Sequence, residues 1–401
     1  MERTKTGNQN NNLNEALKNY IVEPYFKDME NTVAVTFSSS DFYAPYLSAL
    51  LLSLVAHTSK GTNYDIVVFT RDMTLDNQKY LKSLIEKENV SLRFLNVAEL
   101  FEGKGIYVPL HVPSVTLETY FRILAPLVFA KYPKVIFMDS DTLILSDLKE
   151  LYNTDITGHP LAAAEELLFQ AAFNEARRSI AEFLEKLRLS DARRYFQGGV
   201  ILFNCDYCNK HHVSEQLLHN ITTRTYEMVD QDAMNELCAN RHLLIGNEWN
   251  YAPCKKSSHF LQFMPDDVKH KYLSITEPKI VHFIGMYWKP WLEVENKYDH
   301  IWWSYARQTI YYEEILYRLC ENMVQRKLKD VNETNGHTIT VLSQQMGLCF
   351  KLSRNKRRFL YYKIMSKITF GKKHKKYKAK YKRLKWEIKE AKRILRCWGG
   401  F

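Results

Sequence analysis

Residues 134–145, KVIFMDSDTLIL, decide the fold expected of this chain. The first five, KVIFM, form an apolar run of strand length, and Asp139 and Asp141 follow directly. Open α/β sheets bind their ligands outside the carboxyl ends of their strands, which is where these aspartates fall. Carboxylates at positions i and i+2 of an extended chain point the same way, so both can reach one cation. The stretch predicts a buried strand that ends in a metal site, and a polar turn capping the strand is the alternative.

Strand and helix candidates alternate on both sides of this stretch. The strand candidates are short apolar runs, at residues 32–37, 65–70, 90–97, 134–138, 199–203 and 279–283. The helix candidates carry apolar residues at helical spacing, at residues 43–57, 75–87 and 117–131, the last interrupted by Pro126. This alternation predicts an α/β fold with a mostly parallel sheet and helices on both faces.

The composition excludes several classes of protein. With 13% aromatic and 46% hydrophobic residues, the 401-residue chain has ample core material, which excludes disorder. Its 14 Gly and 11 Pro exclude a collagen-like fibre. Seven Cys, an odd and small number, do not fit a disulfide scaffold and favour a reducing compartment.

The net charge of +11 is unevenly distributed. Residues 351–401, the basic tail, contain 20 Lys or Arg and only two Glu, a balance of +18. The preceding 350 residues therefore carry −7. A strongly basic tail on a mildly acidic body points to an anionic surface, either a membrane or a nucleic acid.

The basic tail also carries an apolar stripe at alternating steps of four and three residues. Its members are Tyr377, Tyr381, Leu384, Ile388, Ala391, Leu395 and Trp398. The pattern predicts a basic amphipathic helix that packs on the body or a partner, binds nucleic acid, or docks on anionic lipid. In lipid docking, each basic residue near the surface contributes about 1 kcal/mol.

Two further features bear on location and metal content. Residues 1–12 are polar and lack the apolar core of a signal peptide, and the apolar-rich residues 47–56 are about half the length of a membrane-spanning helix. We therefore expect a cytoplasmic protein. Cys205 and Cys208, with His211 and His212, form a rival zinc candidate, but no second pair lies at finger-like spacing.

Six ordered segments resemble the retaining glycosyltransferases of family 8, the group that contains bacterial lipopolysaccharide galactosyl- and glucosyltransferases and glycogenin. They are VTFSSSDFYAPYL (35–47), ETYFRIL (118–124), KVIFMDSDTLIL (134–145), YFQGGVILFN (195–204), DQDAMN (230–235) and HFIGMYWKPW (282–291). One Asp-x-Asp motif is common by chance, but six segments in order are not. The resemblance implies a GT-A nucleotide-sugar-binding fold and transfer from a UDP-sugar with the anomeric configuration retained.

The resemblance implies roles for residues around the cation and the nucleotide. Asp139, Asp141 and His282 would be the metal ligands, and mixed carboxylate and imidazole ligation favours Mn²⁺ over Mg²⁺. The nucleotide would be held by Phe37, Ser38, Ser40, Asp41, Tyr43, Arg122 and Ser140, with Tyr43 beside the uracil. Ser40 stands where the best-known bacterial members have an aspartate that contacts the base, and a hydroxyl can still hydrogen-bond it.

The sugar and diphosphate would be held by four residues implied in the same way: Gln197, Gly198, Gly285 and Lys289. Three residues separate Gly285 from Lys289, one more than in the family pattern. Asp230 would bind donor-sugar hydroxyls and Gln231 would lie near the anomeric carbon. Because an amide is a poor nucleophile, front-face attack by the acceptor hydroxyl is favoured over a covalent intermediate on Asp230 or Gln231.

The sequence thus predicts a polar leader (1–31), a GT-A catalytic domain (32–295), a helical extension (296–350) and the basic tail (351–401), with a turn-rich boundary near 330–337. The function predicted is metal-dependent, retaining transfer of a hexose, glucose or galactose, from a UDP-sugar to a cell-envelope glycan or lipid-linked acceptor. Lipid docking by the tail, on the inner face of the cell membrane, is then favoured over nucleic-acid binding. The alternative is a non-catalytic protein that binds UDP-sugar or anionic surfaces through a degenerate GT-A domain.

Overall fold

A computed structural model describes residues 18–102, 106–110, 115–254, 260–285, 289–332, 362–363 and 371–397 of the chain. Two compact units are present, one of Met1–Pro290 with Val294–Tyr312 and one of Trp291–Glu293 with Glu313–Phe401. The expected domain boundaries at residues 31, 295 and 350 stay predictions. Most of the leader (1–17), residues 333–350, and residues 351–361, 364–370 and 398–401 of the tail lie outside the described residues.

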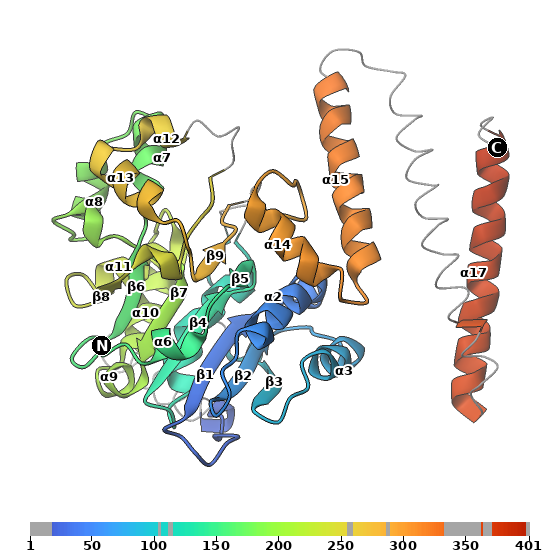
Figure 1. Cartoon of the computed structure of the whole chain (residues 1–401), viewed down its shortest axis with the longest axis horizontal. Helices are drawn as coiled ribbons and strands as arrows, with labels where there is room; N and C mark the ends of the chain where they lie inside the picture. The colour runs from blue at the N-terminus through green and yellow to red at the C-terminus, as the bar shows by residue number, and fades with distance from the viewer. Residues whose placement is uncertain are drawn as a thin grey trace, which may run out of the picture. The chain divides into compact units, whose positions relative to one another are not determined.

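A seven-stranded sheet forms the centre of the first unit (Figure 1). In spatial order its strands are β3 (Val90–Asn96), β2 (Asn63–Thr70), β1 (Thr32–Ser38), β4 (Lys134–Asp139), β7 (Phe196–Asn204), β6 (Leu161–Glu165) and β8 (Leu243–Ile245). β7 pairs antiparallel with both of its neighbours, and every other pairing is parallel. The mostly parallel α/β sheet predicted from the sequence is therefore confirmed.

The two central strands bring the predicted site residues to one edge of the sheet. β1 is buried from Thr32 to Phe37, and Val135–Met138 of β4 have no exposed surface. In the parallel pairing of these strands, Ser38 lies opposite Asp139. Continuous apolar runs are expected for parallel strands that are covered on both faces. Burial of these two runs thus places their polar carboxyl ends side by side.

The helices begin close to where the sequence predicts them, with one exception. A short 3₁₀ helix, η2 (Asp41–Tyr43), leads into α2 (Ala44–Ala56), and α3 (Leu75–Leu84) follows β2. The helix expected at 117–131 is instead a 3₁₀ helix, η3 (Leu117–Leu124), followed by the short α5 (Ala125–Val128). Pro126 lies in the first turn of α5, where its missing N–H costs no hydrogen bond, so it starts a helix rather than interrupting one.

A small second sheet carries His282 to the edge of the main one. The strand expected at 279–283, β9 (Ile280–His282), pairs antiparallel with β5 (Thr142–Ile144). Thr142 lies opposite His282 in this pairing, directly after the Asp139-Ser140-Asp141 stretch. The sequence did not predict β5, β6 or β8, which are only three to five residues long.

The remaining helices include a group that packs beside the sheet around Leu168, Met264 and Tyr272 (Figure 1). In chain order the helices are α4 (Glu99–Glu102), α6 (Leu148–Tyr152), α7 (Phe169–Glu175), α8 (Ile180–Lys186), α9 (Cys205–Lys210), α10 (Val213–Thr223), α11 (Val229–Leu237), α12 (Phe260–Phe263), α13 (Asp266–Ser274), α14 (Lys297–Ala306), α15 (Tyr312–Asn332) and α17 (Gly371–Cys397). Within the described ranges, none of them is long and apolar enough to cross a membrane.

Candidate functional site

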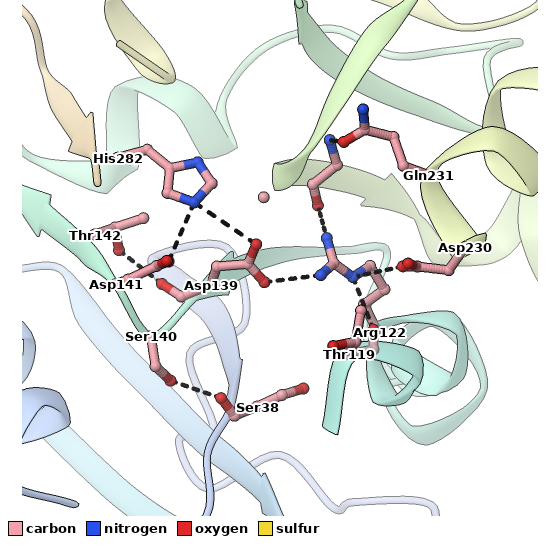
Figure 2. A network of polar contacts seen from close by, with 12 residues as sticks. Ser38, Thr119, Arg122, Asp139, Ser140, Asp141, Thr142, Asp230, Gln231 and His282 are labelled. Carbon is pink, nitrogen blue, oxygen red and sulfur yellow. Dashed lines mark hydrogen bonds and ion pairs between the residues drawn. The ribbon is translucent and has the colours of Figure 1, made fainter. Parts of the chain in front are cut away.

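Three side chains from separate elements converge at the carboxyl edge of the sheet (Figure 2). Asp139 ends β4, Asp141 precedes β5, and His282 ends β9. His282 Nε2 lies 3.1 Å from Asp141 Oδ1 and 3.7 Å from Asp139 Oδ2. Each residue offers a ligand atom within 4.8 Å of the others, and no other group of three in the described part of the chain does so. The rival zinc cluster at Cys205 and Cys208 is therefore not formed.

The backbone beside this cluster packs tightly against two of its members. Gly199 of β7 faces it, and a Cβ at this position would lie 2.1 Å from His282 Cε1 and 2.8 Å from Asp139 Oδ2. Any larger residue would displace the imidazole or the carboxylate. Two carboxylates and one imidazole form a donor set that suits Mn²⁺ and related divalent cations. The residues present therefore fit a divalent metal.

A chain of amide side chains orients His282 toward the carboxylates. The Nδ1 of His282 lies 3.0 Å from Asn250 Oδ1, and Asn250 Nδ2 donates to Gln197 Oε1 at 2.7 Å. Gln197 Oε1 also accepts from the backbone N–H of Gly199. Because Asn250 Oδ1 can only accept, Nδ1 carries a proton, and Nε2 is the ring nitrogen that faces the two aspartates and could ligate a cation there. This is the usual support of a metal-binding histidine.

Arg122 of η3 joins the cluster to a second carboxylate, Asp230 of α11 (Figure 2). Its guanidinium lies 3.0 Å from Asp139 Oδ1 and 2.9 Å from Asp230 Oδ2, and it donates to the carbonyl of Gly198. Burial raises the pKa of Asp139, and the charge of Arg122 opposes that shift. Burial likewise raises the pKa of Asp230 to about 6 against the effect of Arg122. Arg122 thus compensates two carboxylates at once, the partly buried Asp139 and the buried Asp230.

Lys289 lies at the site in spite of the extra residue that precedes it. Its ammonium group pairs with Asp141 and donates to the carbonyl of Phe283. Burial would raise the pKa of Asp141, but the charges of Lys289 and His282 outweigh it and hold that pKa below its usual range. Gly285, with φ of +76°, has the left-handed backbone that favours glycine. Residues 286–288, between them, lie outside the described residues.

The loop after β1 begins next to the aspartates, because Ser38 pairs with Asp139 across the two parallel strands. Ser140 Oγ donates to the carbonyl of Ser38 at 2.6 Å, and burial together with the charge of Asp141 raises the pKa of Tyr43. Phe37 is buried in the sheet. Asp41 turns away from the site, because its Oδ1 accepts hydrogen bonds from Thr74 and Asn77 at 2.7–2.8 Å. The predicted nucleotide loop is thus close to the aspartates, and Asp41 fastens it to α3. Ser40, which precedes η2, is the remaining member.

Gln231 and Gln197 approach the cluster from the side of β7. Gln231 Oε1 accepts from the backbone N–H of Gly198 at 2.9 Å, and Asp230 is almost fully buried. Val229, the first residue of α11, has φ of +43°, which is strained for a β-branched residue. A strained helix start therefore presents the two predicted catalytic residues, Asp230 and Gln231.

Sequence reasoning missed four polar residues here: Glu166, Tyr195, Asp232 and Asn250. Tyr195 and Asp232 lie in segments that resemble the family, but the resemblance implies no role for them. Glu166 follows the unpredicted strand β6 and lines a small pocket together with Gln197 and Asn250. Burial raises the pKa of Glu166 to about 7, although the Leu168 N–H donates to it. A carboxyl group with such a pKa can take up or release a proton near neutral pH.

Comparisons with known proteins agree with this geometry. A family model described as glycosyl transferase family 8 matches residues 34–295, so the chain belongs to this family. Glycosyltransferase GlyB of Streptococcus pneumoniae is 23% identical over 322 residues, 77% of this chain and 69% of GlyB.

Two solved structures share the fold. The apo structure of the bifunctional glycosyltransferase WbbM is 27% identical with a TM-score of 0.66, and the alignment covers 74% of this chain and about half, 53%, of WbbM. The galactosyltransferase LgtC, solved in complex with donor and acceptor sugar analogues, is 20% identical with a TM-score of 0.54, covering 69% of this chain and 96% of LgtC. The GT-A fold expected from the sequence is confirmed.

We predict that Asn250→Ala weakens Mn²⁺ binding about 10–100-fold, because His282 loses the acceptor that fixes its tautomer. Isothermal titration of the protein with Mn²⁺ measures this. Asn209→Ala is the matched control, since Asn209 Nδ2 donates to the carbonyl of Pro126 and takes no part in the cluster. Equal Mn²⁺ affinity in the two variants would contradict the role of Asn250.

A second prediction concerns the pH dependence of stability. The raised folded-state pKa of Glu166 means that the folded protein binds more protons than the unfolded chain between pH 4.5 and about 7. Stability from this group is therefore lost as the pH rises through that window, by about 3 kcal/mol. Glu166→Gln should match the native protein near pH 4.5 and be more stable at pH 8.

Urea unfolding of the metal-free protein at the two pH values checks this. Glu175 is exposed, and Glu175→Gln should leave the difference in unfolding free energy between the two pH values as it is in the native protein. If Glu166→Gln is no more stable than the native protein at pH 8, the buried carboxyl group of Glu166 is ionised at little cost in free energy, which contradicts the prediction.

Proposed function

We propose that this chain is a metal-dependent, retaining hexosyltransferase that moves glucose or galactose from a UDP-sugar to a cell-envelope glycan or lipid-linked acceptor. The observation that carries the proposal is the Asp139, Asp141 and His282 cluster, joined by Arg122 to Asp230 at the carboxyl edge of a family 8 domain. Transfer from a nucleotide sugar requires a site that holds a diphosphate and a sugar side by side. The cluster and the Arg122–Asp230 pair offer those two functions next to each other.

Asp139, Asp141 and His282 would hold the cation, with Mn²⁺ favoured over Mg²⁺ by the imidazole. When bound, a divalent cation neutralises charge that builds up on the diphosphate leaving group. Lys289 pairs with Asp141 in this structure and would exchange that partner for a phosphate oxygen of the donor. Gly285 would let the backbone approach the diphosphate.

The loop formed by Phe37, Ser38, Ser40, Asp41 and Tyr43 would hold the uridine, together with Ser140. Support comes from Ser38, whose buried Oγ has no hydrogen-bond partner among the described residues. A buried hydroxyl without a partner costs free energy unless a ligand completes it. Tyr43 lies near enough to Asp141 for that charge to raise its pKa, so its ring can border a nucleotide bound at the cation.

Asp230, Gln231, Gln197 and Gly198 would hold the donor sugar, with retention by front-face attack. Asp230 is paired with Arg122, and the amide oxygen of Gln231 accepts from Gly198. Neither group is a free nucleophile in this arrangement. The acceptor hydroxyl would therefore attack on the face of the departing diphosphate, whose oxygen can take the proton.

The basic tail would dock the enzyme on anionic lipid at the inner face of the cell membrane. At 100° per residue, Lys375, Lys378, Lys382, Lys389 and Trp386 of α17 fall within an arc of about 80°, and all five are exposed. Lysines around an exposed tryptophan are typical of a helix at a lipid headgroup surface.

The apolar stripe of α17 lies on a different face and is used in packing. Leu384 is buried, and the ring of Tyr377 lies 6.0 Å from that of Tyr362 within the second unit. Membrane contact would therefore come from the lysine face, and the apolar stripe would hold the helix in its unit. Trp398 and much of the tail before α17 lie outside the described residues.

We predict that the native protein hydrolyses one or more UDP-hexoses in the presence of Mn²⁺, and that Asp141→Ala lowers the rate at least about 10²-fold. The measurement is UDP release across a panel of UDP-sugars, followed by product analysis on membrane extract. The exposed Asp155→Ala is the control for loss of one carboxylate. Absence of turnover by the native protein with every donor would favour the non-catalytic binding protein.

We predict that replacing Lys375, Lys378, Lys382 and Lys389 by Glu lowers binding to phosphatidylglycerol vesicles about 10³-fold, at about 1 kcal/mol for each lysine. Vesicle co-sedimentation measures this, and UDP-sugar hydrolysis should persist. The control carries the same charge change at four exposed lysines of the first unit, Lys60, Lys79, Lys186 and Lys210. Equal vesicle binding by both variants would contradict lipid docking, and DNA binding by the native protein alone would favour the nucleic-acid interpretation.

A further inference from the structure

α11 is fastened to the start of β7 by side chains that follow the two predicted catalytic residues along the helix. Asn235 Oδ1 accepts from Phe196 N at 2.9 Å, and Asn235 Nδ2 donates to Phe196 O at 2.9 Å. The amide thus pairs with the edge of β7 as a neighbouring strand would. This pairing brings Asp232 and Gln231, one turn earlier on α11, against Tyr195 and Gly198.

Asp232 has both of its carboxylate oxygens occupied. Oδ1 accepts from the hydroxyl of Tyr195 at 2.7 Å, and Oδ2 accepts from the backbone N–H of Met228 at 2.7 Å. The side chain is only 1% exposed. The bond to Met228 closes the turn that contains the strained Val229, so Asp232 holds the helix start in the conformation that presents Asp230 and Gln231.

The direction of each hydrogen bond fixes the orientation of the Gln231 amide. Since the carboxylate of Asp232 only accepts, the hydroxyl of Tyr195 must donate to it. The Tyr195 oxygen is then left to accept, and Gln231 Nε2 donates to it at 3.0 Å. Gln231 Oε1 is turned to the other side, where Gly198 N donates to it at 2.9 Å. Reversing the amide would place two donors against each other at Gly198.

We propose that Tyr195 and Asp232 are positioning residues, which hold the Gln231 amide in this single orientation beside the donor sugar. This inference rests on the proposed function, because it assigns the pair to the sugar-transfer step. The Tyr195 ring has a separate task, since it packs 4.7 Å from the ring of Phe169 and 5.6 Å from that of Phe183. The hydroxyl and the ring can therefore be tested apart.

Tyr195→Phe removes the hydroxyl and keeps the ring. We expect kcat for UDP-sugar hydrolysis and transfer to fall about 10²-fold, while KM for the donor changes less than about twofold, because a misplaced group near the reacting atoms affects the transition state most. Tyr226→Phe is the matched control, because the Tyr226 hydroxyl donates to Glu236 of α11 at 2.6 Å and has no contact with Gln231 among the hydrogen bonds described. The midpoint temperature of thermal unfolding should fall to a similar extent in both variants.

Asp232→Asn tests the direction of the hydrogen bonds and is the second variant if Tyr195→Phe does not fold. In this variant the side-chain oxygen of residue 232 still accepts from Met228 N, so its NH₂ group must donate to the Tyr195 oxygen. The Tyr195 hydroxyl then donates to Gln231 instead of accepting from it, which requires the Gln231 amide to reverse. We expect the same loss of kcat, and Glu236→Gln, the matched change of an acid on α11, should keep the native kcat.

Crystal structures of the variants test the positioning without reference to activity. In Tyr195→Phe the Gln231 side chain should leave Gly198 N, and in Asp232→Asn its amide should be reversed. An unmoved Gln231, or equal kcat in Tyr195→Phe and Tyr226→Phe, would overturn the inference. If the native protein turns over no UDP-sugar but Gln231 still moves as expected in the variants, the proposed function is contradicted. Tyr195 and Asp232 would then have a structural role only.

Discussion

The guanidinium of Arg122 is the group on which the candidate site depends. It is buried between Asp139 and Asp230, and it also donates to the carbonyls of Gly198 and Thr119. Without a compensating charge, the partly buried Asp139, the buried Asp230 and the neighbouring Asp141 would repel one another and favour protonation. A fixed cation at this point lets Asp139 of the candidate metal cluster and Asp230, the proposed donor-sugar ligand, lie side by side. Arg122 lies in η3 and contacts residues of β4, β7 and α11. A shift of any of these four elements relative to the others would therefore break one of its contacts.

The fold meets this requirement by pairing segments that are far apart in the sequence. β1 and β4 lie in parallel, so Ser38 meets Asp139 across 101 positions. β5 and β9 carry His282 to the same edge, and Gly199 of β7 leaves the space that the ligands need. The positions of the candidate metal ligands therefore depend on how the strands pair. A substitution such as a side chain at Gly199 would disturb the binding site and the sheet together.

Much of the sheet could be predicted from the sequence because its central strands are uninterrupted apolar runs, TVAVTF and KVIFM, which only a doubly covered strand can bury. The candidate metal ligands Asp139 and Asp141 could be predicted from the same stretch, since their positions follow from where the strand ends. Glu166 could not, because β6 is the short run LAAAE, which is too weak a pattern to mark a strand. The roles of Asn250 and Tyr195 could not be predicted either, since their partners His282 and Asp232 are 32 and 37 residues away.

By itself the sequence determined the α/β fold, the sheet edge at which the candidate site lies, the two aspartates and the separation of an acidic body from a basic tail. These follow from local pattern, because strand burial and charge are properties of neighbouring residues. Only the tertiary structure decided that Arg122 compensates two aspartates, that Asp41 faces α3, and that Tyr195 and Asp232 fix one orientation of Gln231. Hydrogen-bond direction and charge compensation depend on which side chains meet in space, and no local pattern records that.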